Sequence, residues 1–174
     1  MSEIRYREAT PPDSATLADL FSRCFVETFG HLYREEDLED FLARLDEQAW
    51  RGELADDRLK IRLAEVAGEA VAFAKLGPVS LPVKAEGKAM ELRQLYVLRP
   101  WQGHGISHHL MAWLLGEAQA AGAEELYLSV WSQNARAQRF YGGYGFEYVG
   151  PYAFMVGNQA DEDEIMRLKL EKAQ

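Results

Sequence analysis

Two glycines lie where a strand-like run passes into a helix-like run, and this junction limits the possible folds more than any other part of the chain. The run 90–98, MELRQLYVL, is typical of a strand, and apolar residues recur with helical spacing from Ile106 to Ala118. Gly103 and Gly105 lie between the two. Glycine weakens an ordinary helix start, but it lets a ligand come close to the main chain. The pattern predicts a strand–turn–helix unit whose backbone cradles a ligand.

The glycine turn does not match the two best-known phosphate-binding motifs. A P-loop requires a lysine after its last glycine, and a dinucleotide-binding fingerprint requires a third glycine where His108 stands. What remains is a set of consecutive backbone N–H groups, from about Gln102 to Ser107, at the positive end of a helix. Such a set can bind a pyrophosphate without a metal. A plain turn between a strand and a helix is the alternative, and the motif alone leaves it open.

The remaining hydrophobic patterns predict an α/β fold. Strands are predicted at 3–9, on both sides of a hairpin turn at Gly68, and at 90–98, 125–131, 146–152 and 163–170. Helices are predicted from the segment 10–25, at 35–50, from the glycine turn to a stop at Gly122, and after a cap at Asn134. The chain has 174 residues, is 48% hydrophobic and shows no repeat or linker. We therefore expect one domain, residues 1–174, with a mixed, mostly antiparallel sheet flanked by helices.

Composition and charge exclude several classes of protein. A net charge of −9 argues against a nucleic-acid binder, which would need a basic stripe. The N-terminal MSEIRYREAT has no apolar signal core, and no run approaches the ~18 apolar residues of a membrane span. We therefore expect a cytoplasmic protein that does not bind membranes. The single cysteine, Cys24, lies in an apolar helical pattern and is predicted to be a buried structural thiol.

Acidic residues are concentrated in one part of the chain. Between Arg34 and Asp57 there are three basic and ten acidic residues, a local net charge of −7. This cluster is either a solvated helical face or a field that attracts a cationic substrate. The histidines, His31, His104, His108 and His109, do not converge at ligand spacing, so we expect no metal site.

Two motifs in order resemble the GNAT superfamily of N-acetyltransferases, over most of the chain. The run 90–98 precedes a turn in which Gln102, Gly105 and Ser107 approximate the family pattern Gln/Arg-x-x-Gly-x-Gly/Ala. The family's later N…A…FY…GF pattern is repeated at Asn134, Ala137, Phe140, Tyr141, Gly145 and Phe146. Ser107 is slightly larger than the usual residue, and Gly142 and Gly143 stand where helix formers usually lie. The resemblance implies the GNAT acyl-CoA N-acyltransferase fold.

The resemblance also implies acetyl-CoA as co-substrate, with its pyrophosphate on the amides of the turn and its pantetheine arm along the preceding strand. Pairing of an extended arm with a strand edge uses backbone hydrogen bonds, so polar side chains are not required there. The cofactor-binding residues so implied are Leu95, Tyr96, Val97, Gln102, Gly103, His104, Gly105, Ile106, Ser107 and Asn134.

Transfer of an acetyl group to an amine needs a free amine and a protonated leaving group. A primary amine with a pKa near ~10.4 is almost wholly protonated at pH 7, and removing that proton costs roughly 4.6 kcal/mol. Glu91 occupies the position from which some family members supply a general base, directly or through water; a glutamate paired with Arg93 or with a neighbouring strand is the alternative. Tyr141 matches the tyrosine that protonates the leaving thiolate in the family; a core aromatic beside Phe140 is the alternative.

A narrower resemblance concerns the acceptor. The segments 26–33, VETFGHLY, and 152–170, YAFMVGNQADEDEIMRLKL, are similar to bacterial spermidine/spermine N-acetyltransferases. The local charge of −7 between Arg34 and Asp57, with the acidic run Asp161–Glu164, offers a field complementary to a polyamine. A small cationic amine, specifically a polyamine, is therefore the expected acceptor, with Glu27, Glu35 and Glu36 as candidate substrate-binding residues.

Three questions stay open at the level of the sequence. The acceptor could instead be a protein N-terminus or a lysine side chain, with the acidic groove against a basic peptide. The chain could also be a CoA-binding interaction module without turnover. The aromatic-rich segment 146–157 fits either a homodimer contact or core packing.

Overall fold

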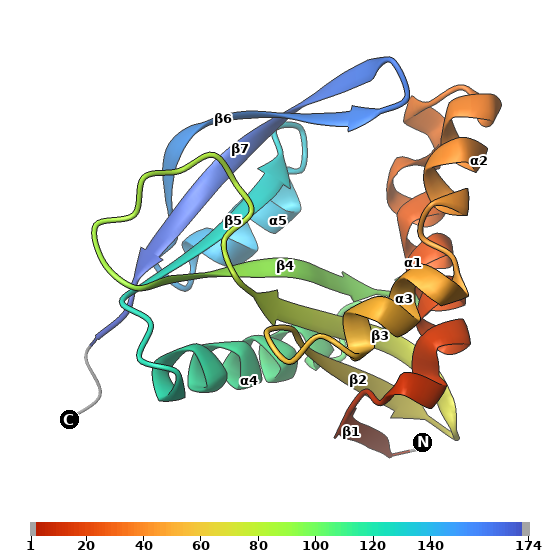
Figure 1. The fold of residues 1–174 in the computed structure, drawn as a ribbon, viewed down its shortest axis with the longest axis horizontal. Helices are drawn as coiled ribbons and strands as arrows, with labels where there is room; N and C mark the ends of the chain where they lie inside the picture. The colour runs from red at the N-terminus through yellow and green to blue at the C-terminus, as the bar shows by residue number, and fades with distance from the viewer. Residues whose placement is uncertain (1–2, 172–174) are drawn as a thin grey trace.

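The computed structural model describes residues 3–171, whose strands form one seven-stranded sheet in the order β1-β2-β3-β4-β5-β7-β6 (Figure 1). The strands are β1 (Ile4–Glu8), β2 (Lys60–Val66), β3 (Glu69–Gly77), β4 (Ala89–Val97), β5 (Glu125–Trp131), β6 (Glu147–Val156) and β7 (Gln159–Lys169). The helices are α1 (Ser14–Phe29), α2 (Glu35–Ala43), α3 (Glu47–Leu54), α4 (Ile106–Ala120) and α5 (Ala135–Gly142), with 3₁₀ turns η1 (Pro11–Asp13), η2 (Gly30–Leu32) and η3 (Arg99–Trp101). β4 and β5 pair in parallel, and the other neighbouring strands pair antiparallel. This confirms the predicted mixed, mostly antiparallel sheet.

Local sequence explains the turns that were predicted. Ala67 and Gly68 both have positive φ, 52° and 82°, as a tight two-residue hairpin turn requires. Gly122, with φ of 79°, follows the last turn of α4 and ends it. Asn134 caps α5, because its side-chain oxygen accepts from the amide of Ala137 at 3.1 Å.

The helix predicted at 35–50 is two helices, which corrects the sequence analysis. α2 ends at Ala43 and α3 begins at Glu47. Between them Asp46 accepts a hydrogen bond from the amide of Ala49 at 3.0 Å and starts a new helix, as aspartate often does at a helix N-cap. The break lets Trp50 turn inward, where it packs edge-on against Phe73 of β3.

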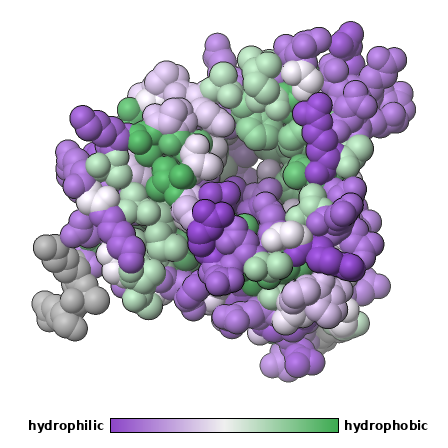
Figure 2. All heavy atoms as spheres, in the orientation of Figure 1, coloured by the Kyte–Doolittle hydropathy of each residue, from purple (hydrophilic) through white to green (hydrophobic). Residues whose placement is uncertain are grey.

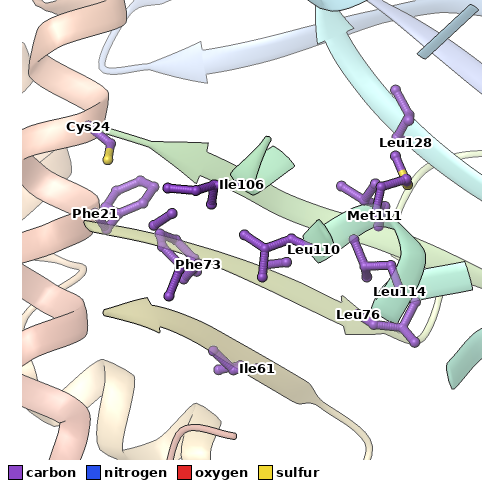
Figure 3. Close-up of a cluster of buried hydrophobic side chains, with 14 of the residues drawn as sticks. Phe21, Cys24, Ile61, Phe73, Leu76, Ile106, Leu110, Met111, Leu114 and Leu128 are labelled. Atoms are coloured by element: carbon purple, nitrogen blue, oxygen red, sulfur yellow. The ribbon is translucent and has the colours of Figure 1, made fainter. Parts of the chain in front are cut away.

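The sheet has a hydrophobic layer on each face. On one face of the sheet, Phe21 of α1 packs against Trp50 of α3, which contacts Phe73 of β3. On the other face, His109 of α4 stacks on Tyr6 of β1. Figure 3 shows part of this core, with side chains from α1, α4 and the central strands gathered together. Cys24 lies in it with 1% of its surface exposed, and burial raises the pKa of its thiol to about 12, so the predicted structural thiol is confirmed as buried.

A β-bulge interrupts β4. The register between β3 and β4 moves from Gln94 opposite Lys75 to Leu92 opposite Leu76, so Arg93 is the extra residue of the bulge. The bulge breaks the alternation of side chains that a regular strand would have.

Across the described part of the chain, no helix is long and apolar enough to cross a bilayer.

Candidate functional site

The parallel strands β4 and β5 stay together over only a third of their length. They pair at Ala89–Glu125, Met90–Leu126 and Glu91–Tyr127 and then diverge, which Figure 1 shows clearly. From Leu92 to Val97 the backbone groups of β4 that face β5 are therefore free of a strand partner on that side. An unpaired strand edge can bind an extended ligand by backbone hydrogen bonds.

A cleft of about 890 Å³ occupies the space where the strands diverge. It extends from the turn before α4 past β4 to the segments around η2 and β7, and Figure 2 shows the surface hollowed on this side of the molecule. Eleven of the fifteen predicted site residues line it: Glu27, Leu95, Tyr96, Val97, Gln102, Gly103, Gly105, Ile106, Ser107, Asn134 and Tyr141. Glu27 and Tyr141, 114 positions apart in the sequence, are thus brought into one cavity only by the tertiary fold.

The turn before α4 forms one end of the cleft. Gly103 and Gly105 have φ of +83° and +81°, which side-chain-bearing residues rarely adopt. The amide of Gln102 donates a hydrogen bond to the carbonyl of Arg99, and the amide of His109 donates to the carbonyl of Gly105. The backbone hydrogen bonds of the turn therefore leave a gap between these two amides. The amides between them stand at the positive end of a 15-residue helix. This end of the cleft has the donors and the field that bind phosphate groups.

Tyr141 lies in the last turn of α5 and faces the cleft with 9% of its surface exposed. Its ring packs edge-on against Phe140 and Phe146. Burial alone raises the pKa of its hydroxyl, and no hydrogen bond from residues 3–171 contributes to this rise. The hydroxyl therefore stays protonated at physiological pH and is available to a group in the cleft. The helix α5, which carries Tyr141, ends at Gly142, and Gly143 is its C-cap residue.

Aromatic rings form the walls at the other end of the cleft. Phe25 and Phe41 pack at 4.9 Å between ring centres, and Phe154 of β6 meets Phe41 edge-on at 5.8 Å. Phe29 meets Trp131 of β5 edge-on at 6.0 Å. These five residues come from α1, α2, β5 and β6, so this end of the cleft lies between the first helices and the β6–β7 hairpin. Aromatic faces attract cations.

Two aspartates of β7 place negative charge among these rings. Asp161 is 7% exposed and accepts hydrogen bonds from the Tyr33 hydroxyl and from Gln159 Nε2, the latter at 3.2 Å. Burial, and then the bond to Asp161, raise the pKa of Tyr33. Asp163 also lines the cleft, and burial together with the charge of Asp161 raises the pKa of its carboxyl to about 6. The second end of the cleft is thus aromatic and anionic, suited to a cation.

A buried ion pair lies at the floor of the cleft. Lys75 of β3 is 5% exposed, and its ammonium contacts a carboxylate oxygen of Glu53 at 2.7 Å and lies 4.8 Å from the centre of the Trp50 ring. Burial lowers the pKa of Lys75, and the charge of Glu53 opposes this effect. The pair keeps a buried cation compensated, so it does not cancel the negative charge on β7.

Glu91 is placed differently from the predicted base. It is 6% exposed and does not line the cleft. Its carboxylate accepts hydrogen bonds from the amides of Ser80 and Leu81, at 2.8 and 3.2 Å, and from the Ser80 hydroxyl. Arg93, its alternative partner, instead donates to the carbonyl of Pro78 at 2.7 Å. Both side chains hold the loop that follows the neighbouring strand β3, and Glu91 is not paired with Arg93.

Three other predicted residues also lie outside the lining of the cleft. Glu35 and Glu36 are exposed in the first turn of α2, where negative charge favours the helix dipole. The side chain of His104 is exposed, with Nδ1 at 3.2 Å from the Gln102 carbonyl oxygen. Glu27 does line the cleft, and its carboxylate accepts a hydrogen bond from the amide of Arg99 at 2.9 Å.

The sequence analysis named the acidic run Asp161–Glu164 as part of a field that attracts a cationic amine, but it assigned none of these residues to the site. Alternation along a strand puts Asp161 and Asp163 of this run on one face. Nothing in the sequence indicates that Tyr33, 128 positions earlier, bonds to that face. Among residues 3–171, no cluster of three metal-ligating side chains is present.

Comparison with known proteins gives a consistent relationship. A family model described as the acetyltransferase (GNAT) family matches residues 15–146. An uncharacterized N-acetyltransferase of Mycobacterium tuberculosis is 30% identical over 155 residues, 88% of this chain and 96% of that protein. An aminoalkylphosphonate N-acetyltransferase of Salmonella typhimurium is 36% identical over 101 residues, 56% of this chain and 65% of that protein.

Solved structures share the fold. The PaiA N-acetyltransferase of Thermoplasma acidophilum, in complex with coenzyme A, has a TM-score of 0.78 at 20% identity and covers 96% of this chain and 99% of its own. The ribosomal-protein-S18-alanine N-acetyltransferase of Escherichia coli has a TM-score of 0.72 at 18% identity, with coverage of 99% and 97%. Both comparisons extend over the whole sheet and its helices.

Proposed function

We propose, from the premise that this chain belongs to the acetyltransferase (GNAT) family, that its acceptor is a small cationic amine and specifically a polyamine. Family membership makes the protein an acetyl-CoA-dependent N-acetyltransferase. The single observation that carries the choice of acceptor is the opposite chemistry of the two ends of the cleft. One end offers amide donors at a helix N-terminus, and the other offers aromatic rings with Asp161 and Asp163.

The residues at the first end fit acetyl-CoA. The free edge of β4 from Leu95 to Val97 suits its amide-containing arm, and the amides from Gly103 to Ser107 suit its pyrophosphate, whereas the predicted amide of Gln102 is bonded to the Arg99 carbonyl. Ser107 lines the cleft in the first turn of α4 and still contributes its amide there. Acetyl-CoA supplies the activated thioester carbonyl. We treat residues 1–174 as one acetyltransferase domain.

Tyr141 is the proposed acid for the departing sulfur. A thiolate has a pKa of about 8.5, so it readily accepts a proton from a neighbouring hydroxyl. Burial keeps Tyr141 protonated, and its hydroxyl has no competing acceptor among the described residues. A core aromatic without a chemical role would more often place its hydroxyl against a polar partner. The position of Tyr141 between the two ends of the cleft supports the role.

Charge supports a polyamine as acceptor. Asp161 and Asp163 both line the cleft, so an extended amine with more than one ammonium would meet two carboxylates there. Glu27 lies in the cleft, whereas Glu35 and Glu36 contribute only through the field of α2. Since screening limits that field to ~8 Å at physiological salt, the β7 carboxylates dominate. The Salmonella relative, named for a small-molecule amine, supports a small acceptor over a protein.

The test compares kcat/KM for spermidine, a neutral-tailed monoamine and a basic peptide, measured by thiol release at two salt concentrations. Spermidine should lead, and its advantage should shrink with added salt because the attraction is electrostatic. A monoamine that equals spermidine at both concentrations contradicts the polyamine. A leading peptide would assign the chain to protein acetylation, and no turnover with any acceptor would leave a CoA-binding module.

A further inference from the structure

The proposed reaction needs a group that removes a proton from the acceptor ammonium, and Glu91 does not reach the cleft. Its carboxylate is held by the amides of Ser80 and Leu81 and by the Ser80 hydroxyl. A base must lie in the cleft, be charged at neutral pH, and be free to accept a proton. Among the described residues, Glu27 and Glu53 also line the cleft, but Glu27 accepts from the Arg99 amide and Glu53 is paired with Lys75.

Asp163 meets the three requirements. It stands on β7 between Trp131 of β5 and Tyr152 of β6 in the strand register. It lines the cleft and is half-buried, and among residues 3–171 no hydrogen bond contributes to its protonation equilibrium. Its neighbour Asp161, by contrast, already accepts from the Tyr33 hydroxyl. The two carboxylates of one strand face thus have different environments, which is typical of acid and base assignments in active sites.

Tyr96 connects Asp163 with the site of transfer. Burial raises the pKa of the Tyr96 hydroxyl, and negative charge on either Tyr141 or Asp163 raises it further. Tyr96 of β4, Tyr141 of α5 and Asp163 of β7 all line the same cleft. Tyr141 itself is 9% exposed, without a hydrogen-bond partner in the described chain. The proposed base and the proposed acid therefore face one cavity.

We infer that Asp163 is the catalytic base, which takes the proton of the acceptor ammonium before the amine attacks. This inference rests on the proposed amine acetylation. Asp161, held by Tyr33, is a positioning residue that supplies negative charge beside it.

Protons and bonds balance in this step. Asp163 takes one proton from the ammonium nitrogen, whose lone pair then forms the C–N bond while the C–S bond of the thioester breaks. Tyr141 protonates the departing sulfur and recovers a proton as the nitrogen loses its second one. Asp163 then releases its proton to solvent, so each turnover yields an amide, a thiol and one proton.

The environment of Asp163 makes it a better base than an ordinary aspartate. Burial and the charge of Asp161 raise the pKa of its carboxyl to about 6, from 3.8, which makes it about a hundredfold stronger as a base and still ionised at pH 7. The other ionisable groups of this end are Asp161, Tyr33, His31, Tyr96 and the Lys75–Glu53 pair. Because histidine side chains in general change charge near neutral pH, a variant of His31 serves as a control.

The test is the pH–rate profile of Asp163→Asn from pH 5 to 9, with spermidine as acceptor and thiol release as readout. Wild type should gain kcat/KM as the pH rises through about 6, because the carboxylate is the active form. The variant should lose this limb, and kcat should fall about a hundredfold or more. CoA affinity by calorimetry should stay within about twofold, and the variant should melt no lower than wild type because a half-buried charge is removed.

Two controls separate the base from neighbouring groups. His31→Gln should keep the limb near pH 6, and Asp19→Asn, an exposed aspartate of α1 outside the cleft, should keep wild-type rates.

Hydroxylamine, which is neutral at pH 8, needs no base, so Asp163→Asn should acetylate it within about threefold of wild type. Carbon-13 NMR of labelled aspartates gives an independent readout, since the carboxyl resonance that titrates near 6 should vanish in Asp163→Asn.

The outcomes distinguish this inference from the proposed function. If wild type acetylates spermidine and Asp163→Asn keeps its rate or its pH limb, Asp163 is not the base, although the acetyltransferase assignment stands. An equal loss with hydroxylamine and spermidine would give Asp163 a structural role and also overturn the inference. If wild type acetylates no amine of the panel, the proposed acceptor class fails and the inference fails with it.

Discussion

The guanidinium of Arg136 donates a hydrogen bond of 2.6 Å to the side-chain oxygen of Gln102, which ties α5 to the turn before α4. Gln102 in turn donates from Nε2 to the carbonyl of Val97 at 3.1 Å. The two bonds bridge the elements that follow β4 and β5, where the strands themselves have separated. Arg136 therefore places a positive charge at the end of the cleft that we assign to acetyl-CoA.

Arg136→Ala should weaken CoA binding about fivefold at low salt, which corresponds to about 1 kcal/mol, and less at high salt. Calorimetry at two salt concentrations measures the effect. Arg139→Ala is the matched control, because Arg139 is exposed on the same helix but does not line the cleft. Equal weakening by both substitutions would show only a general effect of net charge.

Gly105→Val should weaken CoA binding and leave the protein folded. Gly105 has φ of +81°, and an added Cβ meets no atom within 4 Å, so the cost comes from the backbone rather than from a clash. We expect a loss of about 1–2 kcal/mol in the free energy of unfolding. Gly116→Val, in the exposed middle of α4 with equally open space, is the control and should bind CoA normally. Native CoA affinity in Gly105→Val would place the cradle elsewhere.

Tyr141→Phe should lower turnover tenfold or more with CoA affinity nearly unchanged, because it removes a proton donor and keeps the ring packing. Steady-state kinetics with calorimetry measures both quantities. Tyr144 does not itself line the cleft, so Tyr144→Phe should keep the wild-type rate although it removes a hydrogen bond to the lining residue His108. An unimpaired Tyr141→Phe would exclude Tyr141 from the chemistry.

Acid unfolding should depend on Asp13. Arg7 donates two hydrogen bonds of 2.8 Å to Asp13, and these bonds hold the pKa of that carboxyl at about 2. Because the folded pKa lies below the unfolded value of 3.8, the stabilisation is complete above pH 4 and is lost as the pH falls towards 2. Arg7 is 38% exposed, so we discount the contribution to about 1–2 kcal/mol.

Asp13→Asn should therefore destabilise the protein at pH 7 and flatten the pH dependence of unfolding between pH 4 and 2, as denaturant titrations would show. Asp56→Asn is the control, because Asp56 pairs with Arg58 in an exposed loop and should matter less. A difference between wild type and Asp13→Asn that stays constant from pH 7 to 2 would contradict this assignment.

Local patterns were enough to predict the elements whose causes are local. The hairpin at Gly68, the end of α4 at Gly122 and the cap of α5 at Asn134 depend on residues within a few positions of each other. The prediction of one helix over 35–50 was wrong for a reason that is also local. The sequence contains the capping residue Asp46, but the helical spacing of the apolar residues around it was given more weight. The glycine turn, Tyr141 and the chemistry of the acetyl donor belong to the same class of contiguous motifs.

The acceptor end of the cleft depends on contacts that no local pattern specifies. Tyr33 and Asp161 are 128 positions apart, and only the packing of the first helices against the β6–β7 hairpin brings them together. Glu91 shows the converse, because its strand position matched a catalytic role while the loop at Ser80 and Leu81 captured its carboxylate. Sequence spacing thus determined which residues share a strand or helix face. Burial, bulges and strand divergence, which arise from the whole sheet, decided which of those faces meet in the cleft.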